Sequence, residues 1–212
     1  LELTAKKVSV TLEGIRQEVV LSSDRWKMEA LFGELERTNP FMAIIFCRTK
    51  RRADKLEEEM ILNGYDCKKL HGSMPQNTRT RVVKEFRELK FQYLIATDVA
   101  ARGLDITGIT HIYNFDIPES PEIYIHRIGR TGRMGEDGAA VTFASPRDEE
   151  KLFEIEKEIK IKLPKKEHVH DMENGSGEPG TKPINRAVNK TVRGALKKDK
   201  RPKVNKRGKR RK

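Results

Sequence analysis

The sequence predicts an α/β fold, with a mostly parallel central sheet of about six strands flanked by helices on both faces. Two observations favour this class. Short apolar runs rich in β-branched residues alternate along the chain with longer segments of helical periodicity. Most of these runs are apolar without interruption, which is typical of strands that are covered on both faces and therefore of a parallel sheet.

Each element has its own local signal. The apolar runs predict strands over Ile15–Leu21, Met42–Cys47, Asp66–Leu70, Tyr93–Ala96, His111–Phe115 and Ala140–Ala144. Apolar residues at helical spacing predict helices over Arg25–Arg37, Lys50–Asn63 and Gln76–Leu89. Two more helices are expected after Ser120-Pro121 and Ser145-Pro146, because serine caps a helix and proline suits its first position.

Composition divides the chain into three parts. We expect residues 1–13 to be an interdomain linker, residues 14–163 to form the folded domain, and residues 164–212 to be a disordered tail. The last segment contains several prolines and glycines and no Phe, Trp or Tyr, so it cannot bury enough apolar surface to offset its ordering entropy. A sequence that starts at Leu1 rather than Met is typical of a piece of a longer protein.

The positive charge is concentrated in the tail. The chain has 44 Lys and Arg against 32 Asp and Glu, and 15 of those cations lie between Thr181 and Lys212 beside one acidic residue, Asp199. Such an arm predicts a polyanionic partner, which it would tether without recognising a sequence. The alternative interpretation of the tail is a nuclear-localisation signal.

Other classes of site receive little support. Cys47 and Cys67 both lie in apolar runs and are expected to be buried thiols rather than a disulfide. No metal site is expected, because His168 and His170 have no further ligands gathered nearby. The sequence shows no long apolar stretch or secretory leader, so we expect a cytoplasmic protein without a membrane partner.

The most informative segment is His126–Arg133, which reads HRIGRTGR and holds three arginines and two glycines. The guanidinium group is always charged and its donors match phosphate oxygens, while glycine allows a ligand to approach the backbone. The segment therefore predicts a site that grips a polyphosphate, with a solvated basic surface as the alternative.

Three more blocks precede this segment in a fixed order: IIFCRTK at 44–50, HGSMPQNTR at 71–79 and ATDVAARGLD at 96–105. Their polar residues begin where an expected strand ends, at Arg48, His71 and Thr97, so in a parallel sheet the blocks share the edge at which ligands bind. Together with HRIGRTGR they resemble motifs IV, IVa, V and VI of the second, C-terminal RecA-like domain of DEAD-box RNA helicases. The resemblance covers roughly residues 12–163.

For ATP, the resemblance implies that Arg130 and Arg133 act as arginine fingers on the γ-phosphate. It implies that His126 and Arg127 link the nucleotide site to the partner domain and to motif V. Asp105 would accept the ribose hydroxyls, with Gly103 allowing the backbone near the nucleotide; on its own, an aspartate after a turn is more often a turn or cap residue.

For RNA, the resemblance implies contacts to the backbone from Arg48, Thr49, Gly72, Gln76, Arg79, Thr97 and Asp98. Such contacts position a strand without reading its bases. Two alternatives stay open: Thr49 caps the helix that starts at Lys50, as well as or instead of binding RNA, and Gln76 with Arg79 forms an ordinary solvated pair. His71 suits either a polar strand end or an RNA contact.

The sequence has no Gly-x-x-x-x-Gly-Lys-Ser/Thr phosphate loop and no Asp-Glu-Ala-Asp run to hold magnesium. ATP and Mg²⁺ would therefore be held mainly by an N-terminal RecA-like domain of the same protein, and the isolated chain should be close to inactive as an ATPase. RNA is the expected partner, with ribosomal RNA or ribosomal particles as candidates. The alternatives are a non-catalytic RNA-binding or RNA-chaperone module acting through the tail, and a DNA helicase.

Overall fold

The computed structural model describes residues 14–104, 106–132 and 137–168. Its centre is a seven-stranded sheet in the order β3-β4-β2-β5-β6-β1-β7, and every neighbouring pair of strands is parallel. The strands are β1 (Ile15–Leu21), β2 (Ala43–Phe46), β3 (Cys67–Leu70), β4 (Tyr93–Ala96), β5 (His111–Asn114), β6 (Gly138–Ala144) and β7 (Lys165–Glu167). The α/β class and the parallel sheet predicted from the sequence are confirmed.

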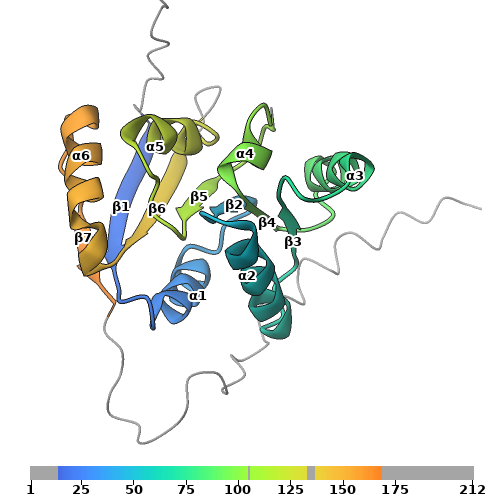
Figure 1. The fold of residues 1–212 in the computed structure, drawn as a ribbon, viewed down its shortest axis with the longest axis horizontal. Helices are drawn as coiled ribbons and strands as arrows, with labels where there is room; N and C mark the ends of the chain where they lie inside the picture. The colour runs from blue at the N-terminus through green and yellow to red at the C-terminus, as the bar shows by residue number, and fades with distance from the viewer. Residues whose placement is uncertain (1–13, 105, 133–136, 169–212) are drawn as a thin grey trace, which may run out of the picture. The chain divides into compact units, whose positions relative to one another are not determined.

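Helices cover both faces of this sheet (Figure 1). They are α1 (Lys27–Thr38), α2 (Lys50–Leu62), α3 (Gln76–Arg87), α4 (Asp98–Ala101), α5 (Pro121–Ile128) and α6 (Glu149–Ile159), with the short 3-10 helix η2 (Pro146–Asp148) before α6. Among the described residues, no helix has the length and apolar character needed to cross a membrane.

Residues of β1 to β6 contribute to two separate hydrophobic cores, one on each face of the sheet, since successive side chains in a strand point to opposite faces. In β2, Ile44 and Phe46 pack with residues of α3, α5 and α6, whereas Ala43 and Ile45 pack with residues of α1 and α2. All four residues of β2 are buried, and this central strand is therefore apolar without interruption.

Most expected elements are found within one to three residues of their predicted ends. Cys47 and Cys67 are free buried thiols, as predicted. Burial raises the pKa of the Cys67 thiol to about 12 and also raises that of Cys47, so neither is a reactive thiolate.

One boundary was wrong. Residues 164–168 were expected to belong to a disordered tail, but Lys165–Glu167 form β7, which pairs in parallel with β1 at the edge of the sheet. The backbone N–H of Val19 donates to Pro164, and that of His168 donates to Leu21. The folded domain therefore extends at least to His168; the rest of the expected tail, and the whole of the expected linker at residues 1–13, lie outside the described residues.

Because all seven strands run in the same direction, their carboxyl ends share one edge of the sheet. The segments that follow β2, β3, β4 and β5 begin at Cys47, His71, Thr97 and Phe115, so the edge gathers three of the four sequence blocks. We call it the carboxyl edge.

Candidate functional site

The arginine block is anchored at the carboxyl edge by α5. Ser120 caps this helix, its hydroxyl accepting a hydrogen bond from the backbone N–H of Ile123, and Pro121 occupies the first turn. The buried residues of the helix are Tyr124, Arg127 and Ile128, at the spacing of one helical face. Local sequence therefore turns Arg127 toward the protein interior, whereas its neighbour His126 is exposed.

The guanidinium of Arg127 joins this block to the segment after β4. Its Nε and Nη2 donate to the two carboxylate oxygens of Asp98 at 2.6 and 2.8 Å. Its Nη1 donates to the side chain of Asn114 at 3.1 Å and to the backbone carbonyl of Asp116 at 2.7 Å. The side chain is 3% exposed, and the planar group lies 4.9 Å from the ring centre of Phe46. This bidentate geometry is the strongest kind of side-chain ion pair.

Asp116, which was not among the predicted site residues, also makes several contacts at the carboxyl edge. One carboxylate oxygen accepts a hydrogen bond from the backbone N–H of Arg48 at 2.9 Å, and the other lies 2.8 Å from Nη2 of Arg52. The available signal was an acidic residue directly after a buried strand. Asp116 therefore fixes the start of the block after β2, while its carbonyl fixes Arg127.

Arg48 has a further partner on the loop before α5. Its Nε lies 2.6 Å from Glu119, and the ammonium of Lys151 lies 2.5 Å from the same carboxylate. The hydrogen bond from Lys151, reinforced by the charge of Arg48, lowers the pKa of Glu119. A hollow of about 290 Å³ opens beside these residues, with the almost fully buried Lys27 in its lining.

Thr49 caps α2, which confirms the helix-cap interpretation of this residue. Its hydroxyl oxygen accepts a hydrogen bond from the backbone N–H of Arg52 at 3.3 Å. A single hydroxyl can cap a helix and still donate to another group, so an RNA contact from Thr49 stays a prediction. His71, at the end of β3, is buried and its Nε2 lies 3.2 Å from Asp54, which fits the interpretation as a polar strand end.

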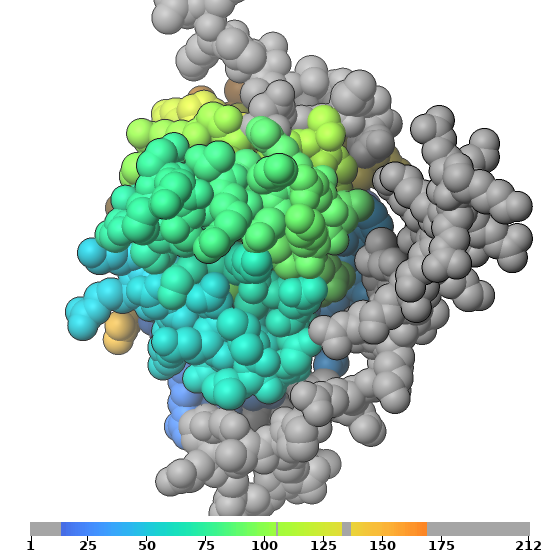
Figure 2. Space-filling model, turned by 90° about the vertical axis from the view of Figure 1, so that its right-hand side faces the viewer, coloured from blue at the N-terminus to red at the C-terminus, as the bar shows by residue number. Residues whose placement is uncertain are grey.

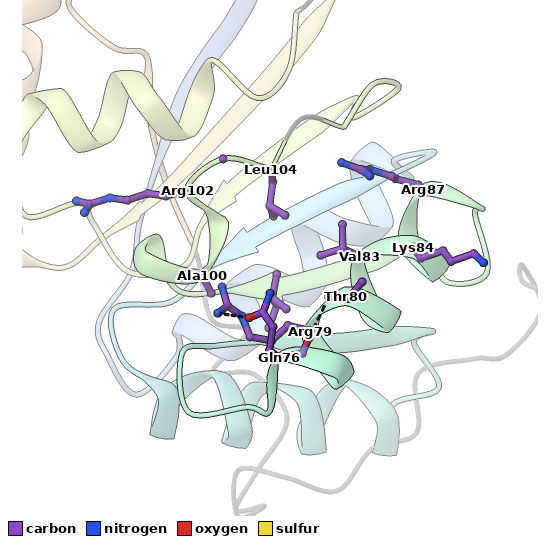
Figure 3. A pocket seen from close by; sticks show the side chains of 11 residues that line it. Gln76, Arg79, Thr80, Val83, Lys84, Arg87, Ala100, Arg102 and Leu104 are labelled. Atoms are coloured by element: carbon purple, nitrogen blue, oxygen red, sulfur yellow. Dashed lines mark hydrogen bonds between the residues drawn. The ribbon is translucent and has the colours of Figure 1, made fainter.

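Gln76 and Arg79 share a face of α3, as their spacing predicted. The amide oxygen of Gln76 accepts a hydrogen bond from Nη1 of Arg79 at 3.1 Å. Both line a hollow of about 470 Å³ between α3 and the turn that follows α4 (Figure 3). Gly72, at the end of β3, has open space around its Cα, so a ligand could approach the backbone there.

Thr97 and Asp98 open α4 at the end of β4. Thr97 is buried, and its carbonyl accepts hydrogen bonds from the backbone N–H groups of Ala100 and Ala101. Asp98 directs both carboxylate oxygens to Arg127. This short helix was not expected from the sequence, because four residues are too few to show helical periodicity.

The turn after α4 meets the arginine block directly. Gly103 has a φ of 75°, a left-handed conformation that favours glycine. Nη1 of Arg130 donates to the carbonyl oxygen of Leu104 at 2.9 Å, and Arg130 is partly exposed. Two expected residues of the nucleotide site, Asp105 and Arg133, lie outside the described residues.

The loop before Arg133 packs closely against the start of β6. A Cβ added to Gly138, at the start of β6, would lie 2.7 Å from the backbone nitrogen of Gly132 and 2.8 Å from the side chain of Thr131. The Thr131 hydroxyl donates to the carbonyl of Ile109 at 2.5 Å. The small residues of the block therefore pack against the sheet, in addition to leaving room for a ligand.

Comparisons with known proteins agree with this architecture. A sequence profile of the family described as "Helicase conserved C-terminal domain" matches residues 26–135, which is more than half of the chain. The chain belongs to this family. It is the C-terminal RecA-like domain of a DEAD-box helicase. The identification confirms the family that the four sequence blocks indicated.

Three relatives illustrate the similarity. The chain is 45% identical over 161 residues to the DEAD-box ATP-dependent RNA helicase CshA of Bacillus cereus, covering 76% of this chain and 31% of CshA. The E. coli DEAD-box protein SrmB, solved with the regulator of ribonuclease activity A, is 34% identical with a TM-score of 0.66; the match covers 74% of this chain and 92% of that one. S. cerevisiae Dbp5, solved with RNA and ADP BeF3, is 31% identical with a TM-score of 0.68. That match covers 73% of this chain and 42% of the Dbp5 chain. The helicase domain thus spans about a third of the length of the curated relatives it matches.

Proposed function

We propose that this chain is the C-terminal half of an ATP-dependent RNA helicase, which binds the RNA backbone and completes an ATP site held mainly by an N-terminal RecA-like domain. The observation that carries the proposal is the pairing of Arg127 with Asp98, because it joins the expected nucleotide block to the expected RNA block in one part-buried contact. The names of its relatives support the same activity: CshA is an ATP-dependent RNA helicase, and Dbp5 has been solved with RNA and ADP BeF3.

On the ATP side, Arg130 and Arg133 neutralise charge on the γ-phosphate as hydrolysis proceeds. Phosphoryl transfer needs little covalent chemistry from the protein, and an arginine finger contributes about 10³- to 10⁵-fold in rate in other nucleotide hydrolases. The contact of Arg130 with the Leu104 carbonyl supports this role, since it holds the arginine beside the turn that contains Gly103. Asp105 accepts the ribose hydroxyls of ATP.

On the RNA side, seven residues contact phosphates and riboses. They are Arg48, Thr49, Gly72, Gln76, Arg79, Thr97 and Asp98. The structure supports the assignment by bringing the ends of β2, β3 and β4 to one edge. Backbone contacts of this kind tolerate any sequence, so the domain would bind RNA without selecting bases.

Arg127 couples the two sides as a positioning residue. Its guanidinium is buried and donates four hydrogen bonds inside the domain, so it acts on ATP or RNA by fixing Asp98 and the end of α5. A shift of Asp98 when RNA binds would be transmitted through this rigid pair to the segment that carries Arg130 and Arg133. His126, exposed on the same helix, contacts the N-terminal domain.

The N-terminal domain supplies the phosphate loop and the carboxylates for Mg²⁺, which this sequence does not contain. The test is to mix the chain with the separately produced N-terminal domain of the same protein and to measure ATP hydrolysis with and without RNA. We expect RNA-stimulated hydrolysis in the mixture and almost none from either part alone. Substantial hydrolysis by this chain by itself, or none in the mixture, contradicts the proposal.

The basic tail supports a second function, a non-catalytic RNA-binding or RNA-chaperone activity. Its 15 cations between Thr181 and Lys212 can neutralise many phosphates, and it lacks aromatic residues for base stacking. Deleting residues 169–212, which leaves β7 intact, should weaken RNA binding and reduce its salt dependence. An unchanged affinity and salt slope would mean that the tail does not tether RNA.

A further inference from the structure

The hollow beside α3 extends well beyond the two residues assigned to RNA. We call it the α3 groove: it lies between α3 and the turn Arg102–Leu104 and has a volume of about 470 Å³. Figure 3 shows Val83 of α3 and Leu104 of the turn pointing toward one another across its middle. In the space-filling view of this side, residues of α3 and of the region around α4 are neighbours on the surface (Figure 2).

The charge of the α3 groove has a single sign. Its described lining residues include four cations and no Asp or Glu. Arg87 reaches over the groove toward Leu104, whereas the side chains of Lys84 and Arg102 lie at its two ends and point outward (Figure 3). Grooves that carry one sign of charge concentrate ligands of the opposite sign, so the lining of this groove favours a polyanion. The cations are Arg79, Lys84, Arg87 and Arg102.

Arg79, which lines the groove, has an N–H group without a hydrogen-bond partner among the described residues. This group is Nε, which is buried, whereas Nη1 bonds to Gln76. A buried donor without a partner costs roughly 1–3 kcal/mol, and a rotation of the Arg79 side chain that brings Nε onto a ligand acceptor would remove that cost. The guanidinium fork matches two phosphate oxygens, and this match distinguishes Arg79 from a lysine.

The shape of the groove favours a chain-like ligand. One stripe of lining residues runs along α3 and spans about 16 Å at 1.5 Å per residue. It consists of Gln76, Arg79, Thr80, Val83 and Arg87. The first turn of this stripe is the part already assigned to RNA, so the groove continues the same track. The apolar patch of Val83 and Leu104 is small and suits the face of a ribose better than the large side chains of a peptide.

We propose that the α3 groove binds a segment of RNA backbone adjoining the one held by Gln76 and Arg79, with its phosphates on Arg87, Lys84 and Arg102. The inference rests on the proposed RNA-binding function and extends its footprint to Lys84 and Arg87, which lie outside the four sequence blocks. An acidic segment of a partner protein is the competing occupant, and the experiments below separate the two.

The first test replaces two exposed cations of the groove. In the 212-residue chain, Lys84→Gln with Arg87→Gln is compared with Lys55→Gln and Lys157→Gln, which remove the same charge from exposed positions on α2 and α6. Binding of a fluorescent oligouridine is measured over a range of salt concentrations. The groove variant should bind roughly tenfold more weakly near physiological salt, with a salt slope reduced by about 1.4. The control shares the same tail and should keep most of the parent affinity.

Failure of this inference differs from failure of the proposed function. If Arg79→Gln weakens RNA binding while the groove variant matches its control, the groove does not bind RNA and the proposed function stands. If neither Arg79→Gln nor the groove variant differs from the control, both the groove and the RNA site at the carboxyl edge are wrong.

A second test uses the low reactivity of the native thiols. Cys47 and Cys67 are buried and their pKa values are raised, so Thr80→Cys introduces the reactive thiol in the described part of the chain. Thr80 is exposed and lines the groove. Oligouridine should slow alkylation of the introduced thiol several-fold, and should not slow alkylation in a Lys55→Cys control. Protection by poly-glutamate but not by oligouridine would overturn the RNA assignment.

Discussion

The guanidinium of Arg127 grips both carboxylate oxygens of Asp98, at 2.6 and 2.8 Å, although the two residues are 29 positions apart in the sequence. The pair crosses from α5 to α4 in front of the carboxyl edge of the sheet. It is buried on the arginine side, while the carboxylate of Asp98 keeps 24% of its surface exposed. The contact therefore combines a structural anchor with a group that can respond to a ligand.

Replacement of Arg127 by methionine should destabilise the domain strongly. Breaking a buried ion pair by removing one partner typically costs about 3–5 kcal/mol. Because water still reaches Asp98, we expect about 2–3 kcal/mol in the free energy of unfolding, measured by urea denaturation. Arg51→Met, at an exposed position of α2, should change it by less than about 0.5 kcal/mol. Equal effects of the two substitutions would show that the pair is not a structural anchor.

Two glycines should respond in opposite ways to alanine. At Gly138 the added Cβ would lie 2.7 Å from the backbone nitrogen of Gly132, so the loop before Arg133 must shift. We expect a loss of about 1–3 kcal/mol in stability. At Gly33, within α1 and open to solvent, the Cβ meets nothing within 4 Å, and alanine should stabilise the helix by about 0.5–1 kcal/mol. Thermal unfolding of the two variants checks both signs.

The sequence predicted the class, the parallel sheet and most element boundaries because buried strands and amphipathic helices have distinct periodicities. It also placed the sequence blocks at one edge, since parallel strands share their carboxyl ends. It did not predict the partners of Asp116. The carboxylate of this residue contacts Arg48 and Arg52, and its backbone carbonyl accepts from Arg127, an arrangement that tertiary packing alone creates.

The strand β7 also lacks a recognisable signal in the sequence. Lys165 to Glu167 are all charged and follow a proline, so they resemble a solvated segment. Charged residues are common on edge strands, where they oppose pairing with other chains. In β7 the ammonium of Lys166 also finds two acidic partners, lying 3.2 Å from Glu18 and 2.8 Å from Glu34.

Truncation should therefore reveal where the domain ends. A chain that ends at residue 163 loses β7, so the edge of β1 is exposed. A chain that ends at residue 168 keeps β7 and its pairing with β1. We expect the shorter chain to be less stable by about 1–2 kcal/mol, since it loses several backbone hydrogen bonds and part-buried ion pairs. Urea denaturation of the two truncated chains measures the difference, and equal midpoints would show that β7 contributes nothing.

His111 should make stability depend on pH near neutrality. Burial, followed by the charges of Arg16 and Arg37, lowers the pKa of this imidazole below its usual value of 6.5, and Glu18 opposes the shift only in part. Between the two pKa values the unfolded chain binds more protons, so the free energy of unfolding falls as the pH drops through about 6.5. His111→Gln should flatten this part of the curve. Denaturation midpoints at several pH values for both proteins test it, and parallel curves would contradict the assignment.

Lysine at Arg133 tests the nucleotide assignment most directly. It keeps the positive charge but loses the planar fork that matches phosphate oxygens. When the chain is combined with its N-terminal domain, we expect ATP hydrolysis to fall by about 10²-fold or more while RNA affinity stays nearly unchanged. Arg81→Lys, an exposed substitution of the same type on α3, should hydrolyse ATP at the parent rate. Near-normal turnover by the Arg133→Lys protein would mean that the catalytic charge comes from elsewhere, and the same measurement on Arg130→Lys would then decide whether the arginine block takes part in hydrolysis.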